Sequence, residues 1–400
     1  MRKARGHHLL LAGLFAASLS LRPQIVGVGP LLPSIQHGLH VSHSVAGLLP
    51  TLVVLCMGLF APAGVSLAHR IGARNSVALA LGLIGSFGVA RALVPSSAAV
   101  IVLTIPVGIG VAVAGTLMPR AVKEAWPERP AYATGLYTTG ISLGAAVSAA
   151  VAVPLADVLW GWRGSLAALS VFTALLLVPW LWFTAHEPPH QRTGDEDAPG
   201  FHWRNRVGWR LVAIFTLTSI AYYGITAWLP TVYVERGWSH ASAGALITVV
   251  SVVTLPVSLV LAWAGDAHGS RRLYLTSGAV LLLLTGIGVV LLPDGAWIWA
   301  VLIGVWVGIT FPSLMTMPLD VGHGARDVAA MAGMMLGVGY SLSSLAPFLF
   351  GAVRDATGSF TAVLWLVVAT AALLALASLN APRRQVAPEG RGAVPSPASR

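Results

Sequence analysis

Charged residues are scarce in this 400-residue chain: Asp, Glu, Lys and Arg make up 10% of it, whereas apolar types make up 56%. A soluble globular chain carries about 25% charged residues, so this chain has too few to cover its apolar side chains. Its one cysteine, Cys56, allows neither an internal disulfide nor a cysteine-ligated metal cluster. These shortages argue against a soluble enzyme and predict an all-α protein that crosses a membrane many times.

Acidic residues are missing from the centre of every long apolar run, and the histidines also lie in loops or near the ends of the runs. Many carriers relay protons through such a central acid or histidine. Enzyme signatures are missing as well, because no Gly-rich phosphate loop and no metal-ligand spacing is present. We therefore expect no catalytic residue, no metal and no cofactor, and the sequence leaves uniport, exchange and proton coupling open.

Twelve apolar runs are each long enough to cross a bilayer as a helix, which takes about 20 residues. They lie at residues 7–35, 44–68, 76–94, 98–124, 131–154, 164–184, 209–231, 242–264, 273–292, 297–318, 328–352 and 360–379. The polar stretch 185–208 divides them into two sets of six. We predict an N-terminal six-helix bundle over 1–184, a cytoplasmic linker over 185–208, a C-terminal six-helix bundle over 209–379 and a disordered cytoplasmic tail over 380–400.

The 24 Lys and Arg residues outnumber the 14 Asp and Glu residues, and their positions are informative. With the N-terminus placed inside, the inner segments hold 19 of them and the outer loops hold 3, while Arg22 and Arg91 fall within runs. Lys and Arg collect on the cytoplasmic side of membrane proteins. Both termini are therefore predicted to be cytoplasmic, in a multi-pass protein of the inner membrane, and the basic excess implies no nucleic-acid partner.

The two sets of six runs repeat each other. Pro33, Gly47 and Gly72 recur as Pro230, Gly244 and Gly269, in each case 197 residues later, without a gap. The first run therefore corresponds to the seventh and belongs to the fold, although it also looks like a signal peptide. A parallel duplication of six spans resembles the major facilitator superfamily, whose substrate site lies near mid-membrane between the halves.

Two loops resemble the loop motif of that superfamily, Asp-Arg-x-Gly-Arg-Arg. The loop after the second run reads His69-Arg70-Ile71-Gly72-Ala73-Arg74, and the loop after the eighth reads Asp266-Ala267-His268-Gly269-Ser270-Arg271, so each copy is incomplete. The resemblance implies a cytoplasmic latch between the halves, formed by Arg70, Gly72, Arg74, Asp266, Gly269 and Arg271. Ordinary cytoplasmic charge beside a turn glycine is the alternative interpretation.

Further stretches are similar to one branch of the superfamily, the cyanate permease and 2-nitroimidazole transporter family. They are Leu21-Arg22-Pro23, Gly29-Pro30-Leu31-Leu32-Pro33, Leu117-Met118-Pro119-Arg120, Gly135-Leu136-Tyr137-Thr138-Thr139, Gly161-Trp162-Arg163, Gly339-Tyr340 and Arg354-Asp355-Ala356-Thr357-Gly358-Ser359. This resemblance implies a monomeric secondary transporter whose two halves rock about a central site.

Arg22 is the strongest candidate for a substrate-binding residue because it lies in the middle of the first run. A charge at that depth costs roughly 2.5–3.5 kcal/mol on insertion scales, and all 14 acids lie in loops, at span ends or in the tail. An anion from outside the protein would supply the missing partner. The alternative is that backbone carbonyls and Gln24 hold Arg22 for folding alone. Pro23 and Pro30 predict a broken helix around it.

Other residues are candidates for the same pocket because of their polarity and depth: Gln24, Arg120, Tyr137, Tyr222, Tyr223, Trp228 and Tyr340. Arg120 fits a second cavity cation or an interfacial side chain, and Trp228 fits the pocket or the aromatic belt at the membrane interface. Arg91 is expected at the membrane interface, and Phe311 is expected mainly to pack.

The sequence thus predicts a membrane transporter for a small anion, such as a cyanate-like ion or a small carboxylate. It would work by alternating access around Arg22, with the lipid bilayer and a small molecule as its partners. The alternative is export of a neutral nitro-aromatic or drug-like compound, in which Arg22 donates a hydrogen bond to a nitro group.

Overall fold

The computed structural model is all-helical over the residues it describes. The backbone is described for residues 12–125, 130–185, 204–268 and 271–382. Side chains are described in the same ranges except at 119–136, 262–268 and 325. The predicted linker and tail fall almost wholly outside these ranges, so their boundaries stay predictions.

Within the described ranges, residues 12–18 are helical and the remaining helices follow in chain order. They are α2 (Pro23–Val26), η1 (Gly29–Leu31), α3 (Leu32–Leu39), α4 (His43–Leu59), α5 (Ala61–Ile71), α6 (Ala73–Leu93), α7 (Ser97–Ala125), α8 (Pro130–Val158), α9 (Gly161–Leu175), α10 (Leu177–Phe183), α11 (Arg206–Glu235), α12 (His240–His268), α13 (Arg271–Leu291), η2 (Pro293–Gly295), α14 (Ala296–Val321), α15 (Ala325–Ser343), α16 (Ala346–Thr357) and α17 (Phe360–Leu379).

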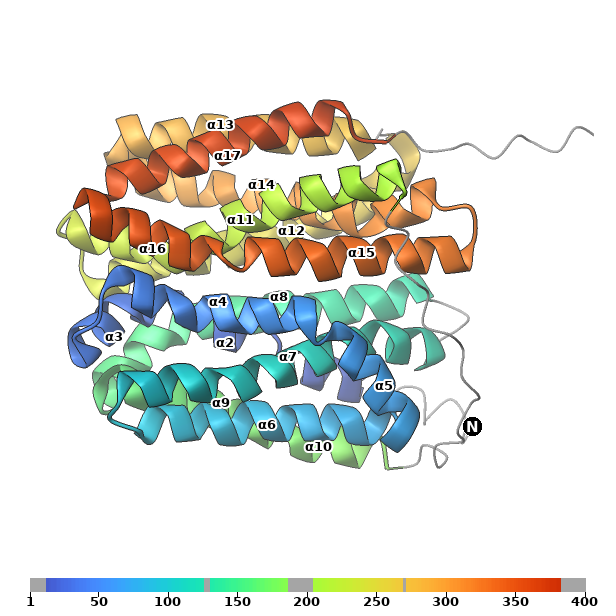
Figure 1. Ribbon diagram of the computed structural model, residues 1–400, viewed down its shortest axis with the longest axis horizontal. Coiled ribbons are helices and arrows are strands. Elements are labelled where there is room, and N and C mark those ends of the chain that lie inside the picture. The colour runs from blue at the N-terminus through green and yellow to red at the C-terminus, as the bar shows by residue number, and fades with distance from the viewer. Residues whose placement is uncertain (1–11, 126–129, 186–203, 269–270, 383–400) are drawn as a thin grey trace, which may run out of the picture.

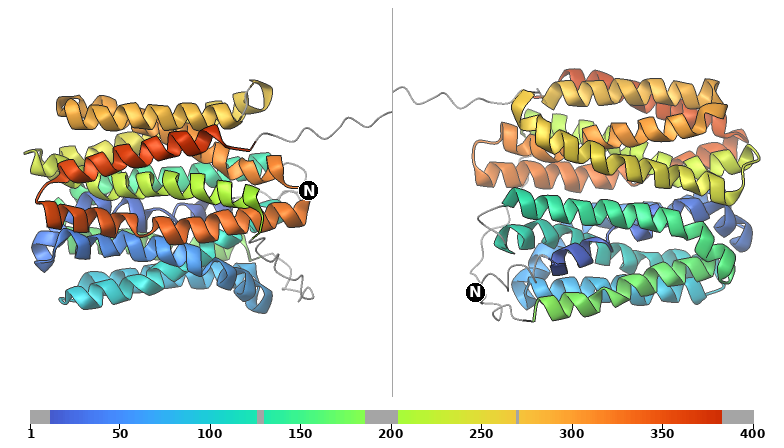
Figure 2. Two further views of the ribbon diagram at one scale, coloured as in Figure 1. Left: turned by 45° about the horizontal axis from the view of Figure 1, so that its top comes forward. Right: turned by 180° about the vertical axis from the view of Figure 1, so that it is seen from behind.

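The helices form two layers of roughly parallel rods. Figure 1 shows α2–α10 in one layer and α11–α17 in the other, with α15 and α16 lying along α4 at the boundary. The view from behind in Figure 2 shows a second contact line between the layers, where α8 lies beside α12. The layers are the two predicted halves, which we call the N-half and the C-half.

Ten described helical stretches are long and apolar enough to cross a membrane, and the pair α4 and α5, bent by 59°, makes an eleventh. The first predicted run is not among these stretches, because α2, η1 and α3 interrupt it and it begins outside the described residues, so the twelfth span stays a prediction. Large apolar side chains cover the outside of the bundle: Leu259, Leu284 and Leu373 are each more than half exposed. Such a surface is stable against lipid tails and not against water. The chain is a multi-pass membrane protein.

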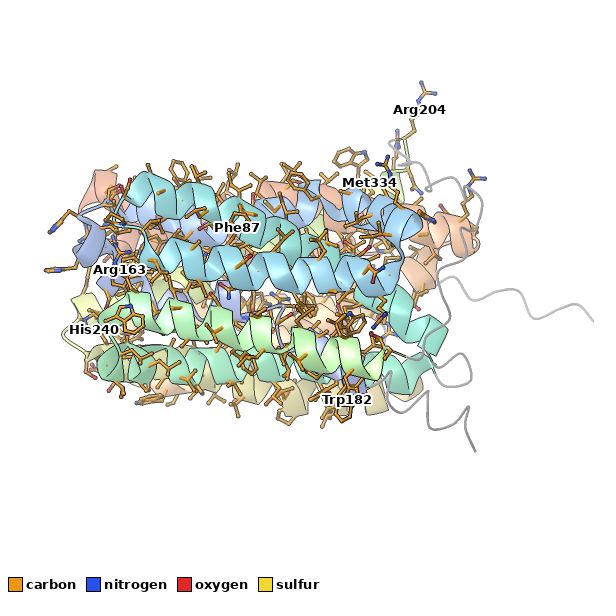
Figure 3. All side chains as sticks on the ribbon, turned by 90° about the horizontal axis from the view of Figure 1, so that it is seen from below. Phe87, Arg163, Trp182, Arg204, His240 and Met334 are labelled. Atoms are coloured by element: carbon orange, nitrogen blue, oxygen red, sulfur yellow. The ribbon has the colours of Figure 1, made fainter. Side chains whose placement is uncertain are left out.

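Polar side chains mark the two ends of the bundle. In Figure 3, Arg163 and His240 lie at one end and Arg204 lies at the other, while Phe87 lies between them on the apolar flank. The ends of α10 and α17 and the start of α11 all lie at the Arg204 end (Figure 1). We call this the terminal end of the bundle.

Short interruptions occur in four spans, whereas the sequence predicted one only in the first. The others are the second span between α4 and α5, the sixth between α9 and α10, and the eleventh between α15 and α16. Among the described candidate spans, the pair of α4 and α5 is the one bent by more than 40°. Pro62 and Pro347 stand in the first turn of α5 and α16, where proline is tolerated while it ends the preceding helix. Pro230 and Pro256 lie inside helices that continue past them, so proline alone does not identify a break.

Candidate functional site

Arg22 stands at the break in the first span. Residues 19–22 form turns, and α2 starts at Pro23, with Arg22 as its N-cap residue. Proline lacks a donor and disfavours helical geometry in the residue before it, so the chain leaves the helix at this position. The short α2 and η1 follow, and η1 packs against α11 and α12 of the C-half. The predicted break is therefore present, and Arg22 lies beside it.

Aromatic side chains of the C-half surround the Arg22 guanidinium. Its Nη1 donates a long hydrogen bond of 3.5 Å to the Tyr223 hydroxyl. Its Cζ lies 5.5 Å from the centre of the Tyr222 ring and 5.9 Å from the centre of the Phe311 ring. Both distances fall within the range of cation–π attraction. Phe311, expected mainly to pack, thus faces the predicted site residue.

Two further tyrosines lie next to this group. The Tyr340 ring packs 6.3 Å from the Tyr223 ring and 5.0 Å from the Phe215 ring. Tyr137 of α8 is close enough to Arg22 and Tyr340 to interact electrostatically with both. The structure therefore gathers four of the predicted pocket tyrosines, Tyr137, Tyr222, Tyr223 and Tyr340, around Arg22. We call Arg22, these four tyrosines and Phe311 the central site.

The central site carries a positive charge with no counter-charge from the described side chains. No described carboxylate forms an ion pair with Arg22, whose described partners are a hydroxyl and two rings. Phenol hydroxyls can both donate and accept, so they can complete the coordination of a small anion or of a neutral polar group. Arg22 itself is partly exposed, as a side chain that meets a ligand must be.

Gln24 and Arg91 form a separate pair inside the N-half. The Arg91 side chain is fully buried and its Nη2 donates to the Gln24 amide oxygen, while Nη1 donates to the Thr104 hydroxyl at 3.3 Å. The expectation that Arg91 lies at the membrane interface is wrong, because α6 turns this side chain into the bundle. Gln24 also donates to Ser170, at 3.4 Å, so its described partners do not include Arg22. Its predicted contact with substrate stays a prediction.

Two other predicted pocket residues are placed differently. Trp228 is 1% exposed and donates from Nε1 to the Pro347 carbonyl at 2.8 Å, two turns along α11 from Tyr222. It is therefore not in the aromatic belt, and its contacts belong to the end of the bundle remote from the termini. The side chain of Arg120 lies outside the described residues, so both interpretations of it stay open.

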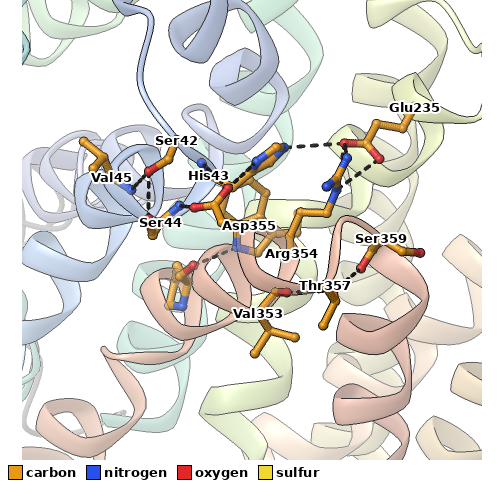
Figure 4. A network of polar contacts seen from close by, with 12 residues as sticks. Ser42, His43, Ser44, Val45, Glu235, Val353, Arg354, Asp355, Thr357 and Ser359 are labelled. Carbon is orange, nitrogen blue, oxygen red and sulfur yellow. Dashed lines mark hydrogen bonds and ion pairs between the residues drawn. The ribbon is translucent and has the colours of Figure 1, made fainter.

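At this remote end the halves are joined by a network of polar contacts, which the sequence did not predict (Figure 4). Asp355 of α16 accepts hydrogen bonds from the backbone N–H groups of His43 and Ser44, at 3.0 and 2.8 Å. It thereby caps the N-terminus of α4 in the other half, where the helix dipole favours a negative charge. We call the network of His43, Glu235, Arg354 and Asp355 the closed face.

Side-chain charges complete the closed face. His43 Nδ1 lies 2.8 Å from Asp355 Oδ1, and His43 Nε2 lies 3.4 Å from Glu235 Oε1. Arg354 binds the same Glu235 carboxylate at 3.0 Å, within the C-half. The His43 ring also packs 5.7 Å from the Trp228 ring. The N-half thus supplies a ring and a helix N-terminus to two carboxylates of the C-half.

Glycines allow the halves to approach closely beside this network. A Cβ added at Gly47 would lie 2.5 Å from the Pro347 carbonyl oxygen, and one added at Gly351 would lie 2.5 Å from the His43 carbonyl oxygen. A Cβ added at Gly29 would overlap the Thr226 carbonyl oxygen. Any side chain at these positions would force the halves apart.

The predicted latch residues lie at the terminal end. Arg74 donates to Thr184 and to the Leu181 carbonyl, both at 3.1 Å, and Arg271 pairs with Asp320 at 2.9 Å. Both sets of contacts stay within one half. Gly72 has a φ of +85° and ends α5, as a turn glycine does. Arg70 is exposed, whereas the Asp266 side chain and Gly269 lie outside the described residues. A latch between the halves stays a prediction.

Comparison with known proteins agrees with this architecture. Residues 9–344 match the Major Facilitator Superfamily. The chain is 30% identical to the 2-nitroimidazole transporter of Escherichia coli, over 94% of this chain and 95% of that one. It is also 30% identical to the cyanate transport protein of Escherichia coli, over 88% of this chain and 91% of that one.

The fold matches solved structures as well. The crystal structure of a D-xylose–proton symporter superposes with a TM-score of 0.73 at 16% identity, covering 93% of this chain and 96% of that one. The duplicated sequence, the all-helical membrane-spanning fold and a superfamily match over most of the chain lead to one conclusion. The chain belongs to the major facilitator superfamily, and it is a secondary membrane transporter of the group that includes the cyanate and 2-nitroimidazole transporters, not an enzyme.

Proposed function

We propose that this protein carries a small anion, such as a cyanate-like ion or a small carboxylate, across the membrane by alternating access around Arg22. The observation that carries the proposal is a guanidinium placed between the halves with hydroxyls and rings around it and no described carboxylate to neutralise it. A partly buried cation whose described partners are all neutral is costly, and a substrate that brings the missing charge reduces that cost.

The arrangement around Arg22 suits reversible binding. The guanidinium offers a planar fork of donors, and Tyr137, Tyr222, Tyr223 and Tyr340 offer hydroxyls from both halves. An anion held between the halves would contact both, and rocking of the halves would then open the site to one side at a time. In this proposal the protein acts as a monomer.

The two ends take different roles in this proposal. The basic excess near the termini supports an orientation with the terminal end in the cytoplasm of an inner-membrane protein and the closed face outside. The closed face is then the outer gate, which separates when the site opens outward. When the site is open to the outside, a latch would hold the cytoplasmic ends of the two halves together. Its residues would be Arg70, Gly72, Arg74, Asp266, Gly269 and Arg271.

Ligand-induced thermal stabilisation of the purified protein tests the anion. A ligand present at 100 times its Kd stabilises the state it binds by about 2.7 kcal/mol. We expect sodium cyanate to raise the unfolding temperature of the wild type above that in sodium gluconate of equal ionic strength. We expect no such rise in Arg22→Ala and a smaller one in Arg22→Lys, which keeps the charge but loses the fork. Arg204→Ala is the matched control, because Arg204 is exposed and projects away from the bundle (Figure 3).

A neutral nitro-aromatic is the other candidate substrate, and 1-methyl-2-nitroimidazole, which has no ring N–H to lose, is its probe. Stabilisation by this compound in both the wild type and Arg22→Ala, with none by cyanate, would overturn the anion proposal. It would make Arg22 a structural residue and favour the export of neutral compounds.

A further inference from the structure

Arg91 is a second buried cation in the N-half, and like Arg22 it has no described carboxylate as a partner. Its side chain is 0% exposed. Its described hydrogen bonds go to two neutral groups, the Gln24 amide oxygen and the Thr104 hydroxyl, and its Nε has no partner. Burying a charge in this way is expensive, and a fold that needed only packing here could use an apolar side chain.

The hydrogen bonds of Arg91 reach the break that presents Arg22. Gln24 lies in α2, a helix of four residues, which is too short to be stable on its own. The Gln24 amide accepts from Arg91 of α6 and donates to Ser170 of α9, and Arg91 also binds Thr104 of α7. Three long helices of the N-half thus hold α2 in place.

Arg22 and Gln24 flank Pro23 and point to different neighbours. Arg22 contacts the rings of the C-half, whereas Gln24 contacts Arg91 and Ser170 inside the N-half. Arg91 is therefore linked to Arg22 through its hydrogen bond to Gln24 and the two peptide units between Gln24 and Arg22. Arg22 belongs to the central site, whereas Arg91 lies inside the N-half. In a low-dielectric interior, a charge that no neighbour neutralises acts over a longer distance than it does in water.

We propose that Arg91 is a positioning residue of the central site. It anchors the broken span through Gln24, and its own unneutralised charge adds to the positive potential in which Arg22 meets its ligand. The proposal rests on the proposed function and extends it, because it makes two cations instead of one responsible for the preference for a negative substrate.

Two variants of the Arg91–Gln24 pair test this role. In Gln24→Glu, the carboxylate keeps the size and the acceptor that Arg91 needs, so the contact with Arg91 is preserved and becomes an ion pair, while the long hydrogen bond to Ser170 at 3.4 Å is lost. The same change neutralises Arg91. The new carboxylate also adds a negative charge of its own near Arg22. The double variant Arg91→Met, Gln24→Leu removes the cation and adds no anion, so it decides whether the charge of Arg91 itself makes the site more positive. Gln36→Glu is the matched control for Gln24→Glu, since it makes the same change on a partly exposed side chain of α3.

The first readout needs no substrate. In a Cys56→Ala, Tyr222→Cys background, the single thiol lies where a ring now faces Arg22 at 5.5 Å. Its rate of alkylation by iodoacetamide, a neutral reagent, is measured against pH, because only the thiolate reacts. We expect Gln24→Glu to raise the midpoint of this profile by about one pH unit, a tenfold change in thiolate stability, and Gln36→Glu to leave it in place.

The second readout is the affinity for cyanate in the native-tyrosine protein. We expect Gln24→Glu to weaken cyanate binding by about tenfold and to leave the binding of any neutral nitro-aromatic unchanged. The two readouts keep the claims apart: a wild type that binds no cyanate contradicts the proposed function, while the thiol profile still decides the role of Arg91.

An unchanged thiol midpoint in Gln24→Glu overturns the inference. The double variant Arg91→Met, Gln24→Leu is the decisive one, because it replaces both partners by apolar side chains of similar length and leaves no orphaned charge. Its midpoint is expected to rise because the cation is gone, and an unchanged midpoint there overturns the inference.

Discussion

The central site and the closed face both lie between the two halves, yet they treat charge in opposite ways. At the closed face every charged group has a partner, and two carboxylates of the C-half meet a ring and a helix N-terminus of the N-half. At the central site, the described partners of Arg22 are the Tyr223 hydroxyl and two aromatic rings. Matched charges let two surfaces close on each other, whereas an unmatched charge leaves a place for a ligand.

The contacts of the closed face are of two kinds, those between the two halves and those within one half. Asp355 and Glu235 bind His43 across the boundary, so these contacts exist only while the halves are together. The pair of Arg354 and Glu235 joins α16 to α11 within the C-half and can persist in any state. Four variants test this comparison, from the largest expected effect to the smallest.

Replacing Arg22 by Gln should abolish transport. Gln keeps a hydrogen-bond donor but removes the charge that we assign to anion binding, so we expect cyanate uptake into proteoliposomes to fall at least about 100-fold. The Tyr223→Phe variant, which removes one hydroxyl and no charge, should lose no more than about tenfold. Equal losses in the two variants would show that the charge at the central site has no special role.

Replacing Gly29 by Ala should open the closed face. The added Cβ would overlap the Thr226 carbonyl oxygen of the other half, and backbone cannot move aside as a side chain can. The readout is labelling of Thr51→Cys, in a Cys56→Ala background, by an impermeant maleimide on whole cells. Thr51 is buried between the halves and accepts from the Phe348 N–H at 3.2 Å.

We expect labelling in Gly29→Ala to rise about tenfold. Gly82→Ala is the control, because nothing lies within 4 Å of a Cβ at Gly82, and in this helix it should only stabilise, by roughly 0.5–1 kcal/mol. Labelling that stays at the wild-type rate in Gly29→Ala would mean that the halves do not close as tightly in the membrane.

Replacing Asp355 by Ala should loosen the same face by a smaller amount. The variant loses the cap on α4 and the contact with His43, and removal of a helix cap costs roughly 0.5–2 kcal/mol. We expect labelling of the thiol at position 51 to rise about three- to tenfold. Asp294→Ala, a carboxylate in the turn η2 of the C-half, should leave labelling unchanged. An equal response to both variants would assign the effect to net charge.

Replacing Arg354 by Gln should have the smallest effect. Its pair with Glu235 is partly exposed and lies within one half, and exposed ion pairs contribute about 0.2–1 kcal/mol. We expect less than a twofold change in labelling at position 51. A change as large as that of Asp355→Ala would show that Arg354 acts across the boundary, through Glu235 and His43.

Much of the fold could be predicted from the sequence because the bilayer imposes simple rules. A span needs about 20 apolar residues, and the ten described apolar stretches and the bent pair of α4 and α5 follow eleven of the predicted runs. Arg22 could be identified for the same reason, since a charge in the middle of an apolar run has few explanations.

The positions of the helix breaks and the partners of the buried side chains were harder to predict. Pro62 and Pro347 begin new helices, whereas Pro230 and Pro256 lie within continuous ones, and their sequence context does not separate the two cases. Arg91 looked interfacial because it stands near the end of its run, and the rotation of α6 decides that its side chain points inward.

The sequence by itself determined which segments are long and apolar enough to cross a membrane, the internal duplication, and the position of Arg22 in the middle of an apolar run. Hydrophobic length and charge are local properties, which a bilayer tests one segment at a time. Only the tertiary structure decided which aromatic rings face Arg22, which cation holds Gln24, and that Asp355 caps a helix 312 positions earlier in the chain, at His43. These contacts join segments that are remote in sequence. They form because helices pack against one another, and a list of apolar runs contains no information about that packing.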